Sequence, residues 1–240
     1  MFFFNARLFF YLVAHGFDVY VANDLDTLLP NFLASKIRRK KLVFDSHEYF
    51  TQVPELVNRP VVQRIWKTLE RLLLPRVKNN YTVCSSIAEL YKKEYKTSFG
   101  VIRNVPDTRE HNGHVKPALQ AFCNNPFFVY IGAVNKGRGV EMAIESLQYV
   151  EGINLLVVGH GDVLENVKQL AIDLNLDNRV LFAGRLMYDE VMAVAKMAVF
   201  GISVEENLGL NYFYALPNKL FTYIHAEIPV LTSNFPEMAQ

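Results

Sequence analysis

The chain has 240 residues, of which 51% are hydrophobic and 20% charged, and its formal net charge is +1. This is a globular composition, and the chain is long enough for one large domain or two small ones. A nearly neutral balance gives no reason to expect a nucleic-acid partner. The two cysteines, Cys84 and Cys123, have no metal-ligand spacing, so we expect reduced thiols in a cytoplasmic protein.

The first seventeen residues, MFFFNARLFFYLVAHGF, are strongly apolar. Asn5 and Arg7 interrupt the stretch, and it is too short to span a membrane. We therefore predict a helix packed against a sheet. The stretch is unusually apolar for a chain terminus, which suggests packing partners that this chain lacks, so we also expect apolar surface to remain open there.

Strand and helix patterns alternate through the first hundred residues. The predicted strands are Asp18–Ala22, Leu42–Phe44, Tyr81–Cys84 and Gly100–Ile102, and the predicted helices are Thr27–Arg39, Val61–Val77 and Ile87–Tyr95. The basic run Lys36–Lys41 ends the first of these helices and is interpreted as a cap that complements the helix dipole. It gives only weak support for contact with a membrane surface.

The periodicity lapses between Pro106 and Pro126, where the chain is polar and flanked by prolines. We interpret residues 106–126 as a linker between a domain at 1–105 and a second domain at 127–240.

The alternation resumes after this segment. The predicted strands are Phe127–Ile131, Asn154–Val158, Arg179–Ala183, Val199–Ser203 and Pro229–Leu231, separated by helices that begin near Val140, Val163, Tyr188 and Pro217. Strands that alternate with helices predict an α/β protein with two doubly wound, Rossmann-like parallel-sheet domains.

A glycine-rich turn joins the strand at Phe127–Ile131 to the next helix. It holds Gly132, Gly137 and Gly139 together with two cations, Lys136 and Arg138. Glycines let a backbone approach a ligand closely, a following helix offers free N–H groups, and the cations suit phosphate oxygens. The turn therefore favours a diphosphate site, although an exposed, solvated turn is the alternative. It matches neither G-x-G-x-x-G nor a P-loop.

Other polar residues also follow predicted strands. Parallel sheets bind ligands beyond the carboxyl ends of their strands, so these residues are candidates for one cleft between two facing domains. They include Asp45-Ser-His-Glu48 in the first half, and Gly159–Asp162 and Glu205–Gly209 in the second.

Six ordered segments resemble the retaining, nucleotide-sugar-dependent glycosyltransferases of family 4 (glycosyl transferases group 1), which have the GT-B fold. These segments are Phe44–Phe50, Val101–Pro106, Tyr130–Gly139, Val157–Asp162, Val180–Arg185 and Pro217–Phe221, the last followed by Ile228–Leu231. The resemblance implies transfer of a sugar from a nucleotide-diphosphate sugar to a glycan or lipid-linked acceptor with retention of configuration. It suggests polysaccharide assembly in the cytoplasm, with possible peripheral contact at the inner membrane face, and neither a cofactor nor a metal.

The same resemblance assigns roles to residues. It implies His47 at the sugar-transfer centre, with Lys136 and Arg138 neutralising the leaving phosphate. A structural histidine satisfied by Asp45 or by backbone remains the alternative for His47. The implied donor-binding residues are Gly132, Gly137, Gly139, Gly161, Glu205, Glu206, Gly209, Asn218, Lys219 and Thr222.

Two departures from the family pattern stand out. Thr222 occupies the helical position at which the family usually carries a ribose-binding glutamate. The family also has further βα units before the region matching Met1–Val21 and a continuation after that matching Gln240, so we expect a chain truncated at both ends. A non-catalytic remnant with a GT-B-like fold is therefore one alternative, and a sugar-nucleotide epimerase of the same architecture is another.

Overall fold

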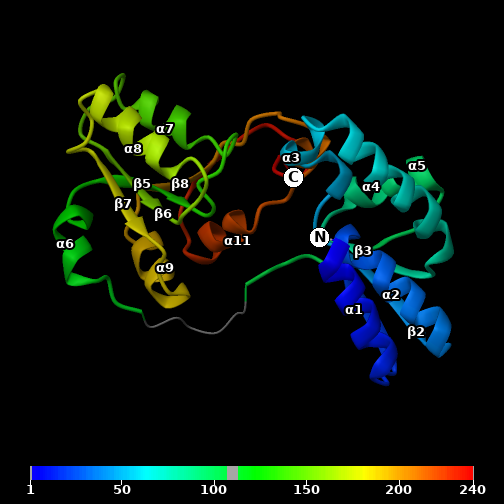
Figure 1. Ribbon diagram of the computed structural model, residues 1–240. Helices are drawn as coiled ribbons and strands as arrows, with labels where there is room; N and C mark the ends of the chain where they lie inside the picture. Colours follow the sequence, from blue (N-terminus) through cyan, green and yellow to red (C-terminus); the bar gives the residue numbers. More distant parts are fainter. Residues whose placement is uncertain (1, 107–112, 240) are drawn as a thin grey trace.

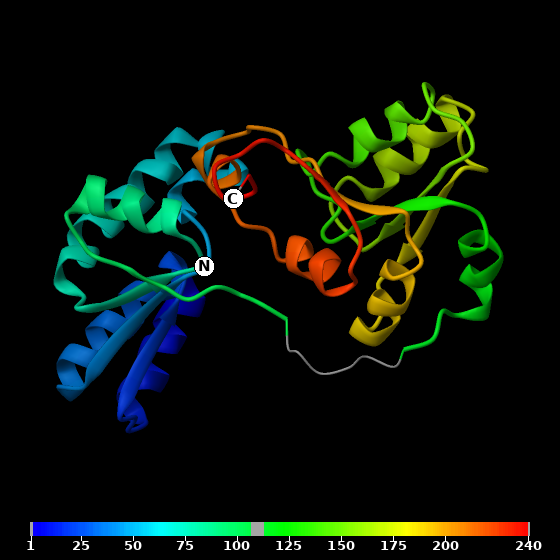
Figure 2. The ribbon, with the colours of Figure 1, turned by 180° about the vertical axis from the view of Figure 1, so that it is seen from behind.

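The computed structural model describes residues 2–106 and 113–239, which form two lobes (Figures 1 and 2). The N-terminal lobe contains a four-stranded sheet in the order β1-β2-β3-β4, and the C-terminal lobe a five-stranded sheet in the order β7-β6-β5-β8-β9. Every neighbouring pair of strands is parallel. The predicted class, an α/β fold with two parallel sheets, is confirmed.

The elements follow the predicted alternation. The strands are β1 (Val19–Asn23), β2 (Lys41–Ser46), β3 (Asn79–Thr82), β4 (Gly100–Val101), β5 (Phe127–Ile131), β6 (Asn154–Val158), β7 (Val180–Gly184), β8 (Phe200–Ser203) and β9 (Val230–Thr232). The helices are α1 (Phe2–Ala14), α2 (Leu25–Arg38), α3 (Pro54–Val57), α4 (Pro60–Leu73), α5 (Ser85–Tyr95), α6 (Pro117–Cys123), α7 (Val140–Ser146), α8 (Leu164–Asp173), α9 (Tyr188–Ala195), α10 (Leu210–Phe213) and α11 (Asn218–His225), with short 3₁₀ turns η1 (Phe50–Gln52) and η2 (Leu74–Arg76).

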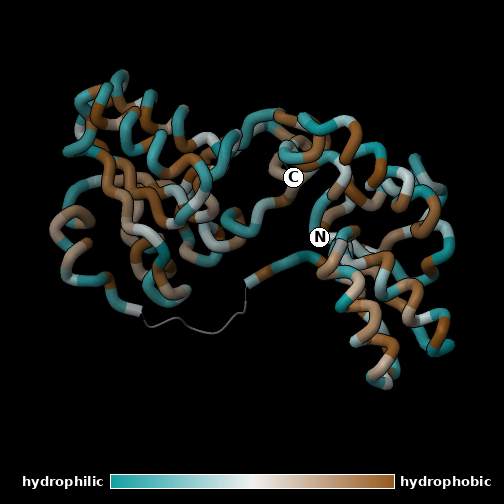
Figure 3. The backbone as a smooth tube through the Cα atoms, viewed as in Figure 1, coloured by the Kyte–Doolittle hydropathy of each residue, from teal (hydrophilic) through white to brown (hydrophobic). Residues whose placement is uncertain are grey.

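Strand β5 is central in its sheet and buried on both faces. Phe128 and Tyr130 pack into the core beneath α7 and α8, whereas Phe127 and Val129 pack on the opposite face, against α6, α9 and α11. Successive strand residues point to opposite faces, so a strand covered on both sides needs an unbroken apolar run. The same hydrophobic character is visible along the sheet of this lobe in Figure 3.

Several elements differ from the sequence-based expectation, among them the linker and the third strand. The predicted linker contains α6, whose Leu119 and Cys123 are buried in the C-terminal core; residues 107–112 of that linker lie outside the described residues. The strand predicted at Tyr81–Cys84 starts and ends two residues earlier, because Cys84 is the N-cap residue of α5.

Apolar surface is open on α1, as expected, and also on the edge strand of the C-terminal sheet. On α1, Phe3 is 83% exposed and Phe10 is 68% exposed, and Leu231 on the edge strand β9 is 57% exposed. Helix α1 packs on α2 and has no substantial contact with any described strand, so the prediction that it packs against a sheet is wrong. Among the described helices, none combines the length and apolarity needed to cross a bilayer.

A segment of the C-terminal lobe crosses to the N-terminal lobe. Residues 204–217, which include α10, pass over the gap between the lobes, and the chain ends beside α3 (Figures 1 and 2). Tyr214 and Leu216 pack against the N-terminal core, and the Tyr49 N–H donates to the Asn211 Oδ1 at 2.8 Å. We call residues 204–217 the bridging segment.

A carboxylate is buried within the N-terminal core. Glu70 of α4 has no exposed surface, and its Oε2 accepts hydrogen bonds from the Tyr95 hydroxyl at 2.6 Å and the Thr51 hydroxyl at 3.1 Å. Burial raises the pKa of Glu70 from 4.5 to about 7, although these two hydrogen bonds oppose the rise. The carboxyl group is thus held largely protonated below neutral pH.

This buried carboxyl group predicts a pH-dependent stability. Between pH 4.5 and pH 7 the folded chain binds more protons at Glu70 than the unfolded chain does, so the free energy of unfolding decreases as the pH rises. The decrease is on the order of 3 kcal/mol and is complete above pH 7. Urea denaturation at pH 5 and pH 8 should show that Glu70→Gln removes this part of the decrease. Glu89→Gln on the exposed face of α5 serves as the control, and an equal decrease in wild type and Glu70→Gln would contradict the prediction.

Candidate functional site

A cleft of about 450 Å³ lies between the lobes and is lined by residues from both. Its N-terminal wall is formed where β2, β3 and β4 end, and its C-terminal wall by the turn after β5, by α10 and by the start of α11. It therefore occupies the position where parallel sheets bind ligands. Of the predicted site residues, those that line it are His47, Gly132, Arg138, Asn218, Lys219 and Thr222.

The cations of this wall are arranged around a buried carboxylate, Glu205. Lys219 Nζ lies 2.9 Å from the Glu205 Oε1, and the nearest Arg138 nitrogen lies 4.0 Å from the same oxygen. The Ser203 hydroxyl donates to the other carboxylate oxygen of Glu205 at 2.9 Å. Glu205 is 3% exposed, so this charge is balanced inside the protein.

Two aromatic rings support the cations. Lys219 Nζ lies 4.2 Å from the centroid of the Tyr130 ring, and the Arg138 guanidinium lies 4.4 Å from that of Tyr212. Desolvation lowers the pKa of Lys219, and Glu205 opposes that decrease. Together the contacts hold two cationic groups side by side at the wall of the cleft.

Gly132 lies beside Lys219, and its backbone conformation, rather than the space around it, requires glycine. Its φ of 139° is disfavoured for L side chains, and a Cβ there would lie 3.6 Å from the Lys219 Cε. Asn218 and Lys219 are the first residues of α11, so the N-terminus of that helix faces the cleft. The N-terminus of the seven-residue α7, by contrast, is buried at Gly139 and Val140.

The other glycines of the predicted site shape the loops. At Gly139, φ is 78°, and a Cβ would lie 2.2 Å from the Val204 carbonyl oxygen. A Cβ at Gly161 would lie 2.1 Å from the Val134 carbonyl oxygen. Gly137 likewise faces the Leu208 side chain, and Gly209 lies against Gln52 of the N-terminal lobe. None of these four lines the cleft, although the close packing of the surrounding backbone depends on them.

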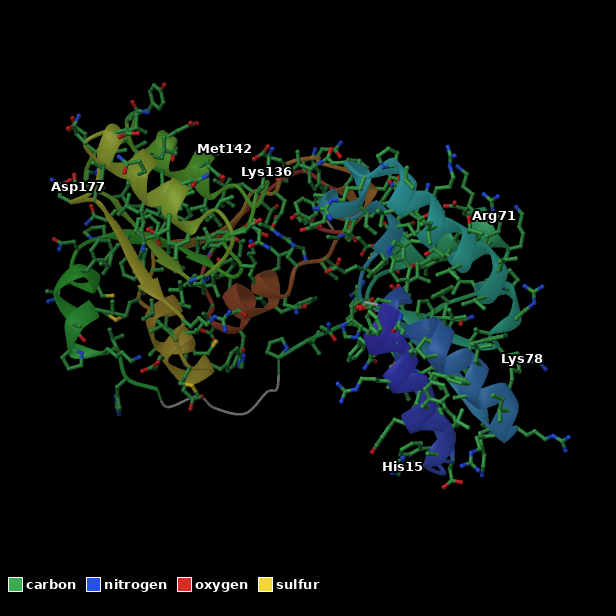
Figure 4. The ribbon with its side chains drawn as sticks, in the orientation of Figure 1. His15, Arg71, Lys78, Lys136, Met142 and Asp177 are labelled. Carbon is green, nitrogen blue, oxygen red and sulfur yellow. The ribbon has the colours of Figure 1, made fainter. Side chains whose placement is uncertain are left out.

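Lys136 and Glu206 lie outside the cleft. Lys136 is exposed, on the same side of the C-terminal lobe as Met142 (Figure 4), and its carbonyl oxygen accepts a hydrogen bond from Tyr212. Glu206 is also exposed, and its N–H donates to the Gly137 carbonyl. The cationic pair at the cleft is thus Arg138 with Lys219, and the buried member of the two glutamates is Glu205.

On the opposite wall, two aspartates hold His47. The imidazole Nε2 lies 2.9 Å from Asp45 Oδ2, and the His47 N–H donates to Asp24 Oδ1 at 2.8 Å. The hydrogen bond to Asp45 is the main cause that raises the pKa of His47. Glu48 also lines the cleft; partial desolvation raises its carboxyl pKa, and the charge of Arg138 opposes that shift.

Thr222 lines the cleft one turn into α11. Its hydroxyl lies 3.5 Å from the carbonyl oxygen of Asn218, a weak contact within the helix. The hydroxyl thus stands where the resemblance leads one to expect a carboxylate. Among the described residues, no group of three or more histidine, cysteine, aspartate or glutamate side chains is arranged to hold a metal ion.

Sequence reasoning missed three residues of the site. Tyr130, Asn211 and Tyr212 line the cleft, but the first was interpreted as part of a strand and the other two were assigned to no element. The short α10, only four residues long, leaves no periodic pattern to detect. The one available signal was the run of three aromatic residues at 212–214, directly after Asn211.

Comparison with known proteins agrees with this geometry. Residues 115–239 match the family described as "Glycosyl transferases group 1". An uncharacterized glycosyltransferase of Methanocaldococcus jannaschii is 27% identical over 210 residues, which cover 79% of this chain and 52% of the relative. The chain thus spans about half the length of that curated relative.

Solved structures share the fold. The Anabaena protein Alr3699/HepE, in complex with UDP and glucose, superposes with a TM-score of 0.74 at 16% identity, covering 98% of this chain and 64% of that one. A point mutant of S. aureus TarM, in complex with Fondaparinux, alpha-GlcNAc-glycerol and UDP, superposes with a TM-score of 0.70 at 11% identity. The match covers 96% of this chain and 45% of the TarM chain. Such likeness shows the fold, which is the GT-B architecture of glycosyltransferases. Because the matched family region takes in more than half of the sequence, the chain belongs to the glycosyl transferases group 1 family.

Proposed function

We propose that this chain moves a sugar from a nucleotide-diphosphate sugar to a glycan or lipid-linked acceptor, with retention of configuration, as in family 4 enzymes. The observation that carries the proposal is the placement of Arg138 and Lys219 together at the cleft, beside Gly132 and the N-terminus of α11. Two cations next to free backbone N–H groups suit the oxygens of a diphosphate. The proposal applies to the whole protein, since its relatives are longer.

In this proposal the donor lies on the C-terminal wall. The bond from the anomeric carbon to the β-phosphate oxygen breaks, and the negative charge that develops on the phosphate is stabilised by Arg138 and Lys219. These cations take the part that a metal ion would otherwise play. Glu205 balances Lys219 while the cleft is empty, and phosphate oxygens compete with it on binding.

The acceptor approaches from the N-terminal wall in this scheme. His47 orients the acceptor hydroxyl or the donor sugar, and Asp45 fixes the imidazole. The acceptor oxygen attacks on the face from which the phosphate leaves, and its proton passes to the departing phosphate oxygen, so configuration is kept. Proton NMR of the glycoside product tests this point: the anomer of the donor is expected, and the opposite anomer would contradict retention.

The setting of the reaction is part of the proposal. A lipid-linked acceptor in polysaccharide biosynthesis would require the enzyme to work in the cytoplasm at the inner face of a membrane. The exposed apolar and cationic surfaces of the N-terminal lobe support such peripheral contact.

Nucleotide binding is the first prediction. Calorimetric titration with UDP, GDP and ADP should show that at least one binds, and that Arg138→Ala weakens binding by roughly tenfold to a hundredfold, the value of a charge-assisted hydrogen bond. Lys219→Gln combined with Glu205→Gln should weaken it similarly, because the double change removes the cation without leaving a buried carboxylate unpaired.

Lys136→Ala is the matched control, since it removes an exposed cation of the same turn that does not line the cleft. It should leave the affinity nearly unchanged. Failure of all three nucleotides to bind, or a larger loss from Lys136→Ala than from Arg138→Ala, would contradict the proposed site.

The second prediction concerns the titration of His47. Asp45→Asn replaces the main cause of the raised pKa, so the imidazole pKa should fall in the variant. NMR titration of the imidazole protons measures it, with His47→Gln identifying the resonance among the six histidines of the chain. An unchanged His47 pKa in Asp45→Asn would show that Asp45 does not control this group.

A further inference from the structure

Helix α4 carries three distinct faces, and only one of them is buried. Leu73 and Glu70 lie on the buried face, and Trp66 packs at its margin against Phe50. The remaining two faces contact no other described element closely enough to be covered, as the exposures of their residues show.

The first uncovered face is apolar. Val61 is 73% exposed, Ile65 57% and Leu72 51%. Positions i, i+4 and i+11 lie within about 40° of one another on a helix of 3.6 residues per turn, so these side chains form one stripe along α4. Single exposed apolar residues are ordinary, but an aligned stripe on one helix indicates a surface that is covered in use.

The second uncovered face is cationic. Arg64, Lys67 and Arg71 line a shallow hollow of about 510 Å³ along the helix, and Figure 4 shows Arg71 on the outer side of the N-terminal lobe. Residues 59–78 contain six cations, Arg59, Arg64, Lys67, Arg71, Arg76 and Lys78. Glu70 is the single carboxylate of that stretch and is buried, so no acidic side chain of α4 opposes the positive charge of this surface.

The basic run at Lys36–Lys41, by contrast, has partners within the protein. Arg38 donates to the Val13 carbonyl oxygen at 2.8 Å and to that of Ala14 at 3.2 Å, which caps the end of α1. Lys40 pairs with Asp18 at 3.0 Å. The run that sequence reasoning associated with a membrane is therefore partly used in holding α1 to α2.

We propose that α4 docks on an anionic lipid surface, with its apolar stripe inserted at the headgroup boundary and Arg64, Lys67 and Arg71 against the anionic headgroups. An apolar stripe beside a cationic stripe on one helix is what such an interface requires. The cationic face alone would also suit a nucleic acid, but that partner would leave Val61, Ile65 and Leu72 in water.

The helix is fixed relative to the cleft. Gln63 Nε2 donates to the Thr51 carbonyl oxygen at 2.8 Å, and the Thr51 hydroxyl donates to Glu70, so two bonds join α4 to the chain just after His47. Docking through α4 would hold the N-terminal wall at a set distance from the bilayer. This orienting role rests on the proposed function, because it concerns a lipid-linked acceptor. The docking of α4 on lipid does not depend on that function.

Flotation with lipid vesicles tests the proposal. Wild type should float with vesicles of phosphatidylglycerol and phosphatidylcholine, less so at higher salt, and much less with phosphatidylcholine alone. Neutralising Arg64, Lys67 and Arg71 together to Gln should weaken partition on the order of a hundredfold, and Val61→Gln with Ile65→Gln should weaken it as well. The matched control neutralises three exposed lysines elsewhere, Lys41, Lys93 and Lys196, and should bind like wild type.

The proposal would be overturned if the wild type did not bind anionic vesicles, or if it bound a short RNA in preference to vesicles. It would also be overturned if the α4 variants bound vesicles as well as the wild type does, a result that would point to α1 instead. Circular dichroism checks that each variant is folded. The assay needs neither donor nor acceptor, so its failure is distinguishable from failure of nucleotide binding, which calorimetry measures on the same samples.

Discussion

The ion pair between Glu205 and Lys219 is the interaction on which the donor side of the cleft depends. Taking two charges out of water costs several kcal/mol for each ion unless close contacts and further hydrogen bonds compensate. Here the Ser203 hydroxyl and the Arg138 guanidinium supply them. The pair fixes the position of Lys219 against Tyr130, and the side chain passes Gly132 to reach the cleft. Loss of either partner would leave a buried charge unbalanced and displace the other.

The bridging segment sets the distance between the two walls. It leaves the C-terminal lobe just before Glu205, contacts the N-terminal lobe through Asn211 and Tyr214, and returns at Pro217 to start α11. The Glu237 carboxylate adds a contact to the Ser86 N–H at 2.6 Å. Since Tyr212 of the same segment lies against Arg138, the contacts that join the lobes also support one of the two cations.

Much of the fold could be predicted from the sequence because its signals are local. The apolar run at Phe127–Ile131 predicts a doubly covered strand from five consecutive residues, and the glycines after it indicate a turn. Helix α6 was missed because it has only seven residues, between prolines, and Leu119 and Cys123 are its only buried positions. The family match at residues 115–239 includes it.

The site was predictable only in part. The turn containing Arg138 and the position of His47 follow from which residues end the strands, and both line the cleft. Sequence spacing favoured Lys136 as the partner of Arg138, because the two lie two residues apart. The partner in space is Lys219, more than eighty residues later, since a ligand wall is assembled from separate strand ends and helix starts. No local pattern carries that information, nor does one distinguish the buried Glu205 from its exposed neighbour Glu206.

The most direct test of this account is a crystal structure of the protein with UDP bound. The account predicts that the diphosphate lies between the lobes, within hydrogen-bonding distance of Arg138, Lys219 and the first N–H groups of α11, with Glu205 turned away from Lys219 or sharing it. A nucleotide bound elsewhere on the surface, or one held by Lys136 with Arg138 and Lys219 untouched, would contradict the central claim.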